Sequence, residues 1–325
     1  MFKTHPILGS LLLSCSMALG AAAQAADYPS KPARVISPFS AGGTNDYLAR
    51  LSAKLLADRL GGTFVVEQRL GAGGMIGADA VAKAAPDGYT LLMGSISTHA
   101  VAPFVYEKLP FDYKQDFTPV TIVANVPLVL VLNPKVPAED VKGLLQLIKD
   151  KPGAYTYGTS GNGTVPHLAG ELFRHVTGTS IVHVPYRGDA NAVSDLLGGQ
   201  IDMMFANLPS VISHIKAGKL RALAVSSTGR SQSLPELPTV AEAGVPGFEV
   251  NAWYALFGPG GMDPAVADKL AATVAQGLRT DEAREQLLGQ GAEAVGNTPA
   301  EFAGFLRAEQ DKWSAVIKQA GIVVQ

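Results

Sequence analysis

Two short loops rich in glycine and hydroxyl side chains carry the chemistry that this sequence suggests. The first, SPFSAGGTND over residues 37–46, joins a predicted strand to a predicted helix. Glycines let a ligand approach the backbone, and the free amides of a helix N-terminus favour an anion. We therefore expect this loop to bind a carboxylate. The same composition would also suit a tight turn in which Thr44 or Asn45 is a simple N-cap.

The second loop repeats this design. It runs YGTSGNGTVPHLAGE over residues 157–171, again with a predicted strand before it and a predicted helix after it. Two polar helix N-termini on facing lobes could hold both ends of a small acid between them. The alternative is that both loops are ordinary glycine-rich turns of an α/β protein.

Two other motifs invite cofactor chemistry and do not fit it. GAGGMIG over residues 71–77 resembles a dinucleotide-binding loop, but its spacing is GxGGxxG and no acid ends the next strand. We expect these glycines to allow a helix to pack closely against a strand. His167, Glu171 and His175 share one predicted helix, but His175 lies about 12 Å along the axis from His167, too far for one ion. We predict neither a cofactor nor a metal.

Nucleophilic catalysis lacks candidates in this chain. It contains no GxSxG, P-loop or HExxH motif, and Ser160 has no obvious base beside it. We therefore predict that the protein is not an enzyme. A periplasmic hydrolase with a triad assembled from distant residues is kept as a minor alternative.

The elements that must position these loops alternate between apolar strands and helical patterns. In the first part of the chain we predict strands at 34–38, 64–67 and 89–94 and helices at 46–60 and 75–85. In the second part we predict a helix at 138–150, strands at 155–158, 181–185, 202–205 and 220–225, and a helix-rich tail at 264–320. Right-handed βαβ crossovers make such sheets parallel, with helices on both faces.

Two longer apolar runs, 120–132 and 250–258, interrupt this rhythm and predict crossings between two lobes. Lobe 1 would comprise residues 26–124 and 250–325, and lobe 2 residues 125–249. Ligands of open parallel sheets lie beyond the carboxyl ends of the strands, where both loops would face a cleft between the lobes. The predicted fold class is α/β, with two doubly wound lobes joined by two crossing strands.

The first 25 residues predict a secretory signal peptide. Lys3 precedes an apolar stretch that ends in small residues at Ala23 and Ala25, and cleavage there would remove Cys15, the only cysteine. The residues before Cys15 also loosely resemble a lipoprotein cleavage box, which would leave a lipid anchor instead. Because no second hydrophobic span follows, we expect a periplasmic mature protein with no segment inserted in the membrane.

The net charge and the length of the chain limit which classes of partner and how many domains we expect. A formal net charge of -2 and a pI near 6.3 offer no basic surface for nucleic acid. About 300 mature residues suit two domains, since single cores stop growing at roughly 250 to 300 residues. We expect a monomer that binds a small molecule.

Six stretches, in order along the chain, closely resemble the tripartite tricarboxylate transporter substrate-receptor family, also called the Bug receptors. They include YPSKPARVISPFSAGGTND, VVEQRLGAGGMIG, YGTSGNGTVPHLAGELF, VHVPYRG, DLLGGQIDMMFANLPS and IKAGKLRALAVSS. The resemblance implies a type II periplasmic binding-protein fold that closes on a carboxylate and delivers it to the membrane permease subunits of a tripartite transporter. A periplasmic sensor subunit of a two-component system would use the same pair of lobes and is the alternative.

The resemblance also implies that the two loops hold the ligand's carboxylates through amides, hydroxyls and bridging waters. With the residues beside them, the predicted ligand-binding set is Phe39, Ser40, Ala41, Gly43, Thr44, Asp46, Thr159, Ser160, Gly163, Thr164, His167, Ala206 and Asn207.

The sequence departs from the family pattern at two places that we expect to lie close to the ligand. The usual PFPPGG reads PFSAGG over residues 38–43, and the common FDN reads FAN over residues 205–207. An aspartate at position 206 could pair with an ammonium group, whereas Ala206 cannot. We therefore predict a ligand without an amine. It would be a dicarboxylate, or an aromatic or otherwise apolar carboxylic acid whose body lies against Phe39, Phe205 or Ala206.

Overall fold

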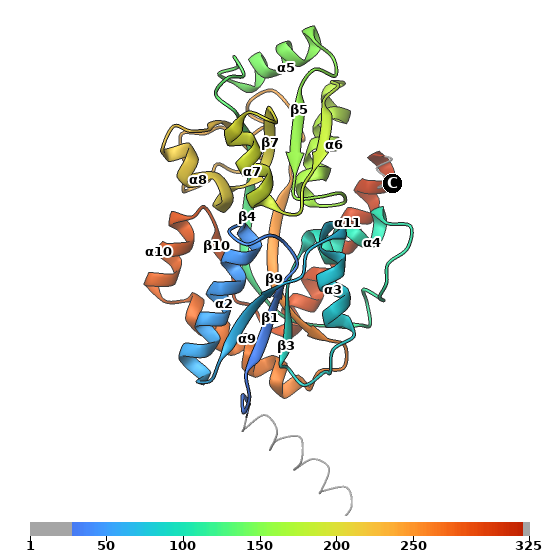
Figure 1. Ribbon diagram of the computed structural model, residues 1–325, viewed down its shortest axis with the longest axis vertical. Helices are drawn as coiled ribbons and strands as arrows, with labels where there is room; N and C mark the ends of the chain where they lie inside the picture. Colours follow the sequence, from blue (N-terminus) through green and yellow to red (C-terminus); the bar gives the residue numbers. More distant parts are fainter. Residues whose placement is uncertain (1–27, 321–325) are drawn as a thin grey trace, which may run out of the picture.

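The computed structural model describes residues 28–320 (Figure 1). The predicted signal peptide and the lipid-anchor alternative at Cys15 lie outside these residues. In Figure 1 lobe 1, coloured blue, teal and red, lies below lobe 2, coloured green and yellow, and strands β4 (Phe117–Leu132) and β9 (Asn251–Pro259) run between them. The predicted α/β fold of two lobes joined by two crossing strands is confirmed.

Lobe 1 is built on a parallel sheet in which β1 lies between β2 and β3. Its first elements are β1 (Ala33–Ser37), α2 (Thr44–Leu60), β2 (Phe64–Gln68), a 3-10 turn (Ala72–Gly74), α3 (Met75–Ala82) and β3 (Thr90–Ser95). α2 and α3 lie on opposite sides of the strands (Figure 1). Consecutive residues such as Leu91 and Leu92 are therefore both fully buried, as in parallel sheets covered on both faces.

The crossing strand β4 changes partners where the chain passes between the lobes. As far as Pro127 it pairs antiparallel with β9, and from Leu128 onward it pairs with β7 and β8 of lobe 2. Asn251, the partner of Pro127, begins β9. We propose that the lobes divide at these two points, which lie three residues and one residue from the boundaries expected from the sequence.

Lobe 2 carries a second, smaller sheet. Its elements are α5 (Val141–Asp150), β5 (Thr156–Thr159), α6 (Val165–Thr177), β6 (Val182–Pro185), α7 (Asp189–Gly198), β7 (Met203–Asn207), α8 (Leu208–Lys216) and β8 (Arg221–Val225). β5 pairs in parallel with β6 on one side and β7 on the other. The central strand β7 is buried throughout, whereas the edge strand β6 is partly exposed.

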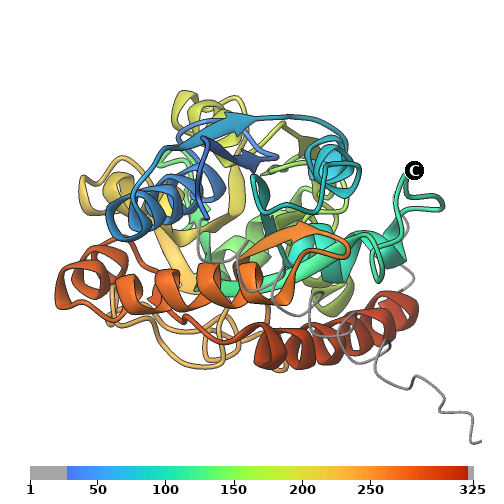
Figure 2. The same cartoon turned by 90° about the horizontal axis from the view of Figure 1, so that it is seen from below.

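The C-terminal part of the chain returns to lobe 1. It forms α9 (Pro264–Leu278), α10 (Asp281–Gly289), the short strand β10 (Glu293–Ala294) and α11 (Pro299–Ala320), and these helices follow one another along one side of the molecule in Figure 2. Two features were not predicted from the sequence: β10, which pairs with β4, and a π-helical turn (Ser97–Val101) continued by α4 (Ala102–Val105). Among residues 28–320, no helix is both long and apolar enough to cross a bilayer.

Candidate ligand-binding site between the lobes

A small cavity lies where the two lobes meet. It is lined by Phe39, Gly43, Thr44, Asn45, Ser95, Ser97, Ser160, Val165, Pro166, Asp189, Asn207, Ala252 and Tyr254. Apart from Ala252 and Tyr254 on β9, these residues belong to the carboxyl ends of β1, β3, β5, β6 and β7 or to the segments that follow those strands. The cavity therefore occupies the place at which open α/β sheets bind ligands.

Four helix N-termini meet at this cavity. α2 begins at Thr44, α6 at Val165 and α7 at Asp189, while Asn207 is the N-cap of α8. No N-cap of these four helices makes a side-chain capping hydrogen bond. Each N-terminus carries partial positive charge, so the cavity favours negatively charged groups although no lysine, arginine or histidine is among its lining residues.

Several buried polar atoms around the cavity have no hydrogen-bond partner within the described residues. They are the hydroxyls of Ser40, Thr44 and Ser95 and the side-chain oxygen of Asn207. Leaving a buried polar group unpaired costs about 1 to 3 kcal/mol, so such groups are rare. Where they occur, they commonly bind a ligand or a water molecule, or they mark local strain. Their gathering at one cavity indicates a polar ligand that supplies the missing partners.

Asp189 is the one carboxylate among the lining residues. The Ser160 hydroxyl donates a hydrogen bond to one of its oxygens, and the Asn207 side-chain amide donates to the other at 2.9 Å. Thr44 faces the same carboxylate from lobe 1, although its hydroxyl lies outside hydrogen-bond geometry. Burial raises the pKa of the Asp189 carboxyl, and the surrounding donors only partly offset this effect.

The lobes touch on either side of the cavity. The Ser40 amide donates to the Arg187 carbonyl at 3.2 Å, and the Tyr106 hydroxyl donates to the Asn162 carbonyl at 2.8 Å. The cavity that remains measures only about 10 Å³, roughly the space of one water molecule. The lobes are therefore closed over the cavity, and an acid can enter it only after they open.

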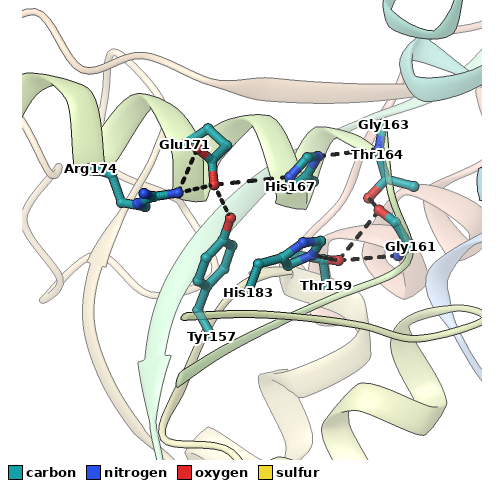
Figure 3. A network of polar contacts seen from close by, with 9 residues as sticks. All are labelled: Tyr157, Thr159, Gly161, Gly163, Thr164, His167, Glu171, Arg174 and His183. Atoms are coloured by element: carbon teal, nitrogen blue, oxygen red, sulfur yellow. Dashed lines mark hydrogen bonds and ion pairs between the residues drawn. The ribbon is translucent and has the colours of Figure 1, made fainter. Parts of the chain in front are cut away.

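A polar network behind the second loop fixes its shape (Figure 3). The Thr159 hydroxyl lies 2.7 Å from Nε2 of His183 and accepts the Gly161 amide at 3.2 Å. The Thr164 hydroxyl donates to the Gly161 carbonyl at 2.7 Å. Both threonines therefore hold the backbone of the loop and do not line the cavity.

His167 belongs to the same support (Figure 3). Its Nδ1 accepts the Gly163 amide at 3.2 Å, which requires a neutral imidazole with the proton on Nε2, toward Glu171. Burial lowers the pKa of His167. Burial also lowers the pKa of His183, to about 4, and the neighbouring His167 contributes to this second shift. The two rings stack with their centroids 4.2 Å apart, so a charge on either would be poorly tolerated.

Asp46 plays the corresponding part behind the first loop. Its carboxylate accepts hydrogen bonds from the Gly42 amide at 3.0 Å, from Arg50 at 2.9 Å and from Gln68 at 2.7 Å. Burial alone would raise the pKa of Asp46, but these three donors outweigh it and lower the pKa below its usual value. Asp46 is therefore fully engaged within lobe 1 and braces the loop.

The structure brings some of the predicted ligand-binding residues to the cavity and not others. Those that line it are Phe39, Gly43, Thr44, Ser160 and Asn207, while Ser40 lies beside it with an unpaired hydroxyl. Those outside the lining are Ala41, which is exposed, the bracing residues Asp46, Thr159, Gly163, Thr164 and His167, and the core residue Ala206.

The location of Ala206 corrects one sequence-based inference. Its side chain is fully buried in the hydrophobic cluster of lobe 2 with Val129 and Leu208, and it is not among the lining residues. Phe205 likewise belongs to the main core. Side chains alternate along β7, so Asn207 faces the cavity when Ala206 faces the core. The absence of a carboxylate at position 206 therefore does not bear on the ligand, and Asp189 supplies a carboxylate instead.

Several lining residues were missed in the sequence. Ser95 ends β3 and Asp189 follows β6 at the start of a helix, so the rule that located the two loops would also have located these residues. Tyr254 and Ala252 come from the crossing strand β9 and carry no such signal. Within residues 28–320, no three histidine, cysteine, aspartate or glutamate side chains are grouped to hold a metal ion.

A family model described as the tripartite tricarboxylate transporter family receptor matches residues 48–322. The chain belongs to this receptor family. Among relatives of the family, protein BugT from Bordetella pertussis is 39% identical over 322 residues, which cover 99% of this chain and 98% of that protein.

Solved structures of proteins that are 32%, 38% and 45% identical to this chain have the same fold. A Rhodopseudomonas palustris protein solved with adipate is 38% identical, with a TM-score of 0.89 and coverage of 91% of this chain and 99% of that one. MatC from the same organism, solved with bound malate, is 32% identical, with a TM-score of 0.85 and coverage of 89% of this chain and 100% of that one. A structure of a periplasmic transporter is 45% identical, with a TM-score of 0.89 and coverage of 92% and 100%.

Proposed function

We propose that this protein is a periplasmic receptor that binds a small carboxylate between its lobes and delivers it to the membrane permease subunits of a tripartite transporter. The observation that carries the proposal is the group of unpaired hydroxyls of Ser40, Thr44 and Ser95 around a cavity at four helix N-termini. Carboxylates accept hydrogen bonds from hydroxyls and amides. The three hydroxyls belong to lobe 1, and lobe 2 contributes the N-termini of α6, α7 and α8. A bound acid would therefore hold the lobes together.

Membership of the receptor family supports the transport role, since relatives have been solved with adipate and with malate. Closure offers the physical link to a permease, because docking subunits can distinguish two closed lobes from two open ones. We further propose that the mature protein acts as a monomer, since each chain contains both halves of the site.

The arrangement around Ser160 argues against catalysis. Its hydroxyl donates to the buried carboxylate of Asp189, whereas the nearby histidines His167 and His183 contact Gly163 and Thr159. A nucleophilic serine needs a base positioned to accept its proton, usually a histidine that is itself oriented by a third group. We propose that the site binds its ligand and releases it unchanged.

A pair of serine substitutions tests this function. Ser95→Ala removes a hydroxyl without an existing partner, so its free energy of unfolding should stay the same or rise. Its affinity for the best carboxylate in a panel of mono- and dicarboxylates, measured by calorimetry, should fall about 10- to 150-fold, the value of a hydrogen bond to a charged group.

The matched control is Ser52→Ala, for which we expect a change in stability and no change in affinity. Ser52 is buried within α2 and donates to the Leu48 carbonyl at 2.8 Å, so Ser52→Ala should lower stability and leave affinity unchanged. Equal affinities of Ser95→Ala and the unmodified protein for every carboxylate that binds would place the site elsewhere. The proposed function itself would be wrong if no carboxylate bound.

A further inference from the structure

Asp189 poses a problem of charge that the proposed function does not solve. It is 5% exposed, and among the residues lining the cavity it meets hydrogen-bond donors but no lysine, arginine or histidine. A ligand carboxylate held by Ser40, Thr44 and Ser95 would bring a second negative charge into the same small cavity. Two carboxylates in one site repel each other unless one is protonated or a cation lies between them.

The helix N-termini do not remove this problem. Asp189 itself occupies the N-terminus of α7, and the first amide of α6, that of Val165, already donates to the Ser97 hydroxyl at 3.0 Å. The partial charge of a helix N-terminus is only about half an elementary charge. Because Asp189 occupies one of these N-termini and the first amide of α6 is already paired, they stabilise a ligand carboxylate less than four free N-termini would.

The carboxylate of Asp189 nevertheless has room for another donor. Ser160 donates to one oxygen and Asn207 to the other, whereas the hydroxyl and amide of Thr44 face the carboxylate without a hydrogen bond of good geometry. Each oxygen of a carboxylate can accept about two hydrogen bonds. The side-chain oxygen of Asn207 beside it is buried and unpaired. A donor group placed here would satisfy both residues at once.

Resting on the proposed function, we propose that Asp189 is a specificity-determining residue that pairs with an ammonium group of the ligand, so that the receptor selects amino acids over the corresponding acids without an amine. Such a ligand carries its own positive charge between its carboxylate and that of Asp189. Burial raises the pKa of Asp189 in the free protein, and an ammonium partner would lower it again by stabilising the ionised form. This specificity is the opposite of the one inferred from Ala206.

The test compares matched ligands by calorimetry: aspartate with succinate, glutamate with glutarate, 2-aminoadipate with adipate, phenylalanine with 3-phenylpropionate, and the other proteinogenic amino acids with their deaminated analogues. We expect at least one amino acid to bind tenfold or more tightly than its partner. Asp189→Asn should reduce that ratio at least tenfold, since an amide carries no negative charge. Asp195→Asn is the control, because Asp195 lies on the same helix and accepts a hydrogen bond from Tyr186 at 2.7 Å.

Proton exchange gives a second readout that does not depend on a variant. Titrations in two buffers of different ionisation enthalpy should show no proton uptake when an amino acid binds. Tighter binding of an acid without an amine, or proton uptake when an amino acid binds, would overturn the assignment of Asp189 and leave the carboxylate-receptor function intact. Failure of all the acids and amino acids to bind would instead overturn that function.

Discussion

The Ser97 hydroxyl of lobe 1 accepts the backbone amide of Val165, the first residue of α6 in lobe 2, at 3.0 Å. This hydrogen bond exists only while the lobes are closed, and it lies at the edge of the cavity. Ser97→Ala should therefore destabilise the closed form by about 0.5 to 1.5 kcal/mol, which corresponds to an affinity about 2- to 13-fold weaker. Calorimetry with the best-binding carboxylate checks this, and an unchanged affinity would mean that this contact does not contribute to closure.

Gly188 and Ser40 approach each other so closely across the lobes that a Cβ at position 188 would collide with the serine. Gly188 also has φ +141°, a conformation that costs other residues roughly 1 kcal/mol or more. We expect Gly188→Ala to lower affinity at least tenfold, because the lobes can no longer close. Gly178→Ala is the control: Gly178 has φ +62° with open space around it, so the variant carries backbone strain without the collision. Equal affinities of the two variants would refute a role for this contact in closure.

The Tyr106 hydroxyl of lobe 1 donates to the Asn162 carbonyl of lobe 2 at 2.8 Å. Because this contact must break before the ligand leaves, Tyr106→Phe should increase the dissociation rate about 2- to 13-fold. Stopped-flow measurement of tryptophan fluorescence can follow opening, since Trp253 lies on the crossing strand β9. Tyr113→Phe, on a ring that packs against Phe104 within lobe 1, should leave the rate unchanged.

The histidines behind the second loop predict a loss of stability in acid. Burial, followed by the effect of His167, lowers the pKa of His183 to about 4, whereas a histidine in an unfolded chain titrates near 6.5. The unfolded chain then binds more protons than the folded one at pH values between these two, so the free energy of unfolding falls as pH drops from about 6.5 toward 4. Urea denaturation at a series of pH values measures this fall.

His183→Gln should make that fall smaller, because one of the groups that must stay neutral has been removed. His175→Gln, at an exposed position on α6, controls for replacing a histidine in this lobe. A pH profile identical for His183→Gln and the unmodified protein would show that His183 does not limit stability in acid.

The strand and helix pattern could be predicted because burial on both faces leaves a strong sequence signal. Predicted strands such as 64–67 and 181–185 differ from β2 and β6 by one residue at one end. The crossing strands could also be predicted from the sequence, because β4 remains apolar while it passes through the sheets of both lobes. The turn at Ser97–Val101 and the two-residue strand β10 were not predicted, because neither is long enough to show a period.

The site was harder to predict because it depends on which way single side chains point. Thr159 ends β5 and turns toward His183, while its neighbour Ser160 turns toward Asp189, and composition does not distinguish these two roles. Ala206 and Asn207 differ in the same way at the end of β7. Asp189 becomes part of the site only because three separate segments of the chain meet around it. Spacing within one segment of the sequence does not reveal this.

The most direct measurement is mass spectrometry of whatever the protein carries when it is purified under native conditions from the periplasm of its host. The account predicts one small carboxylate per chain, recovered chemically unchanged, with markedly lower occupancy in Ser95→Ala than in Ser52→Ala. A bound molecule without a carboxylate, conversion of the bound acid into a product, or equal occupancy in the two variants would contradict it.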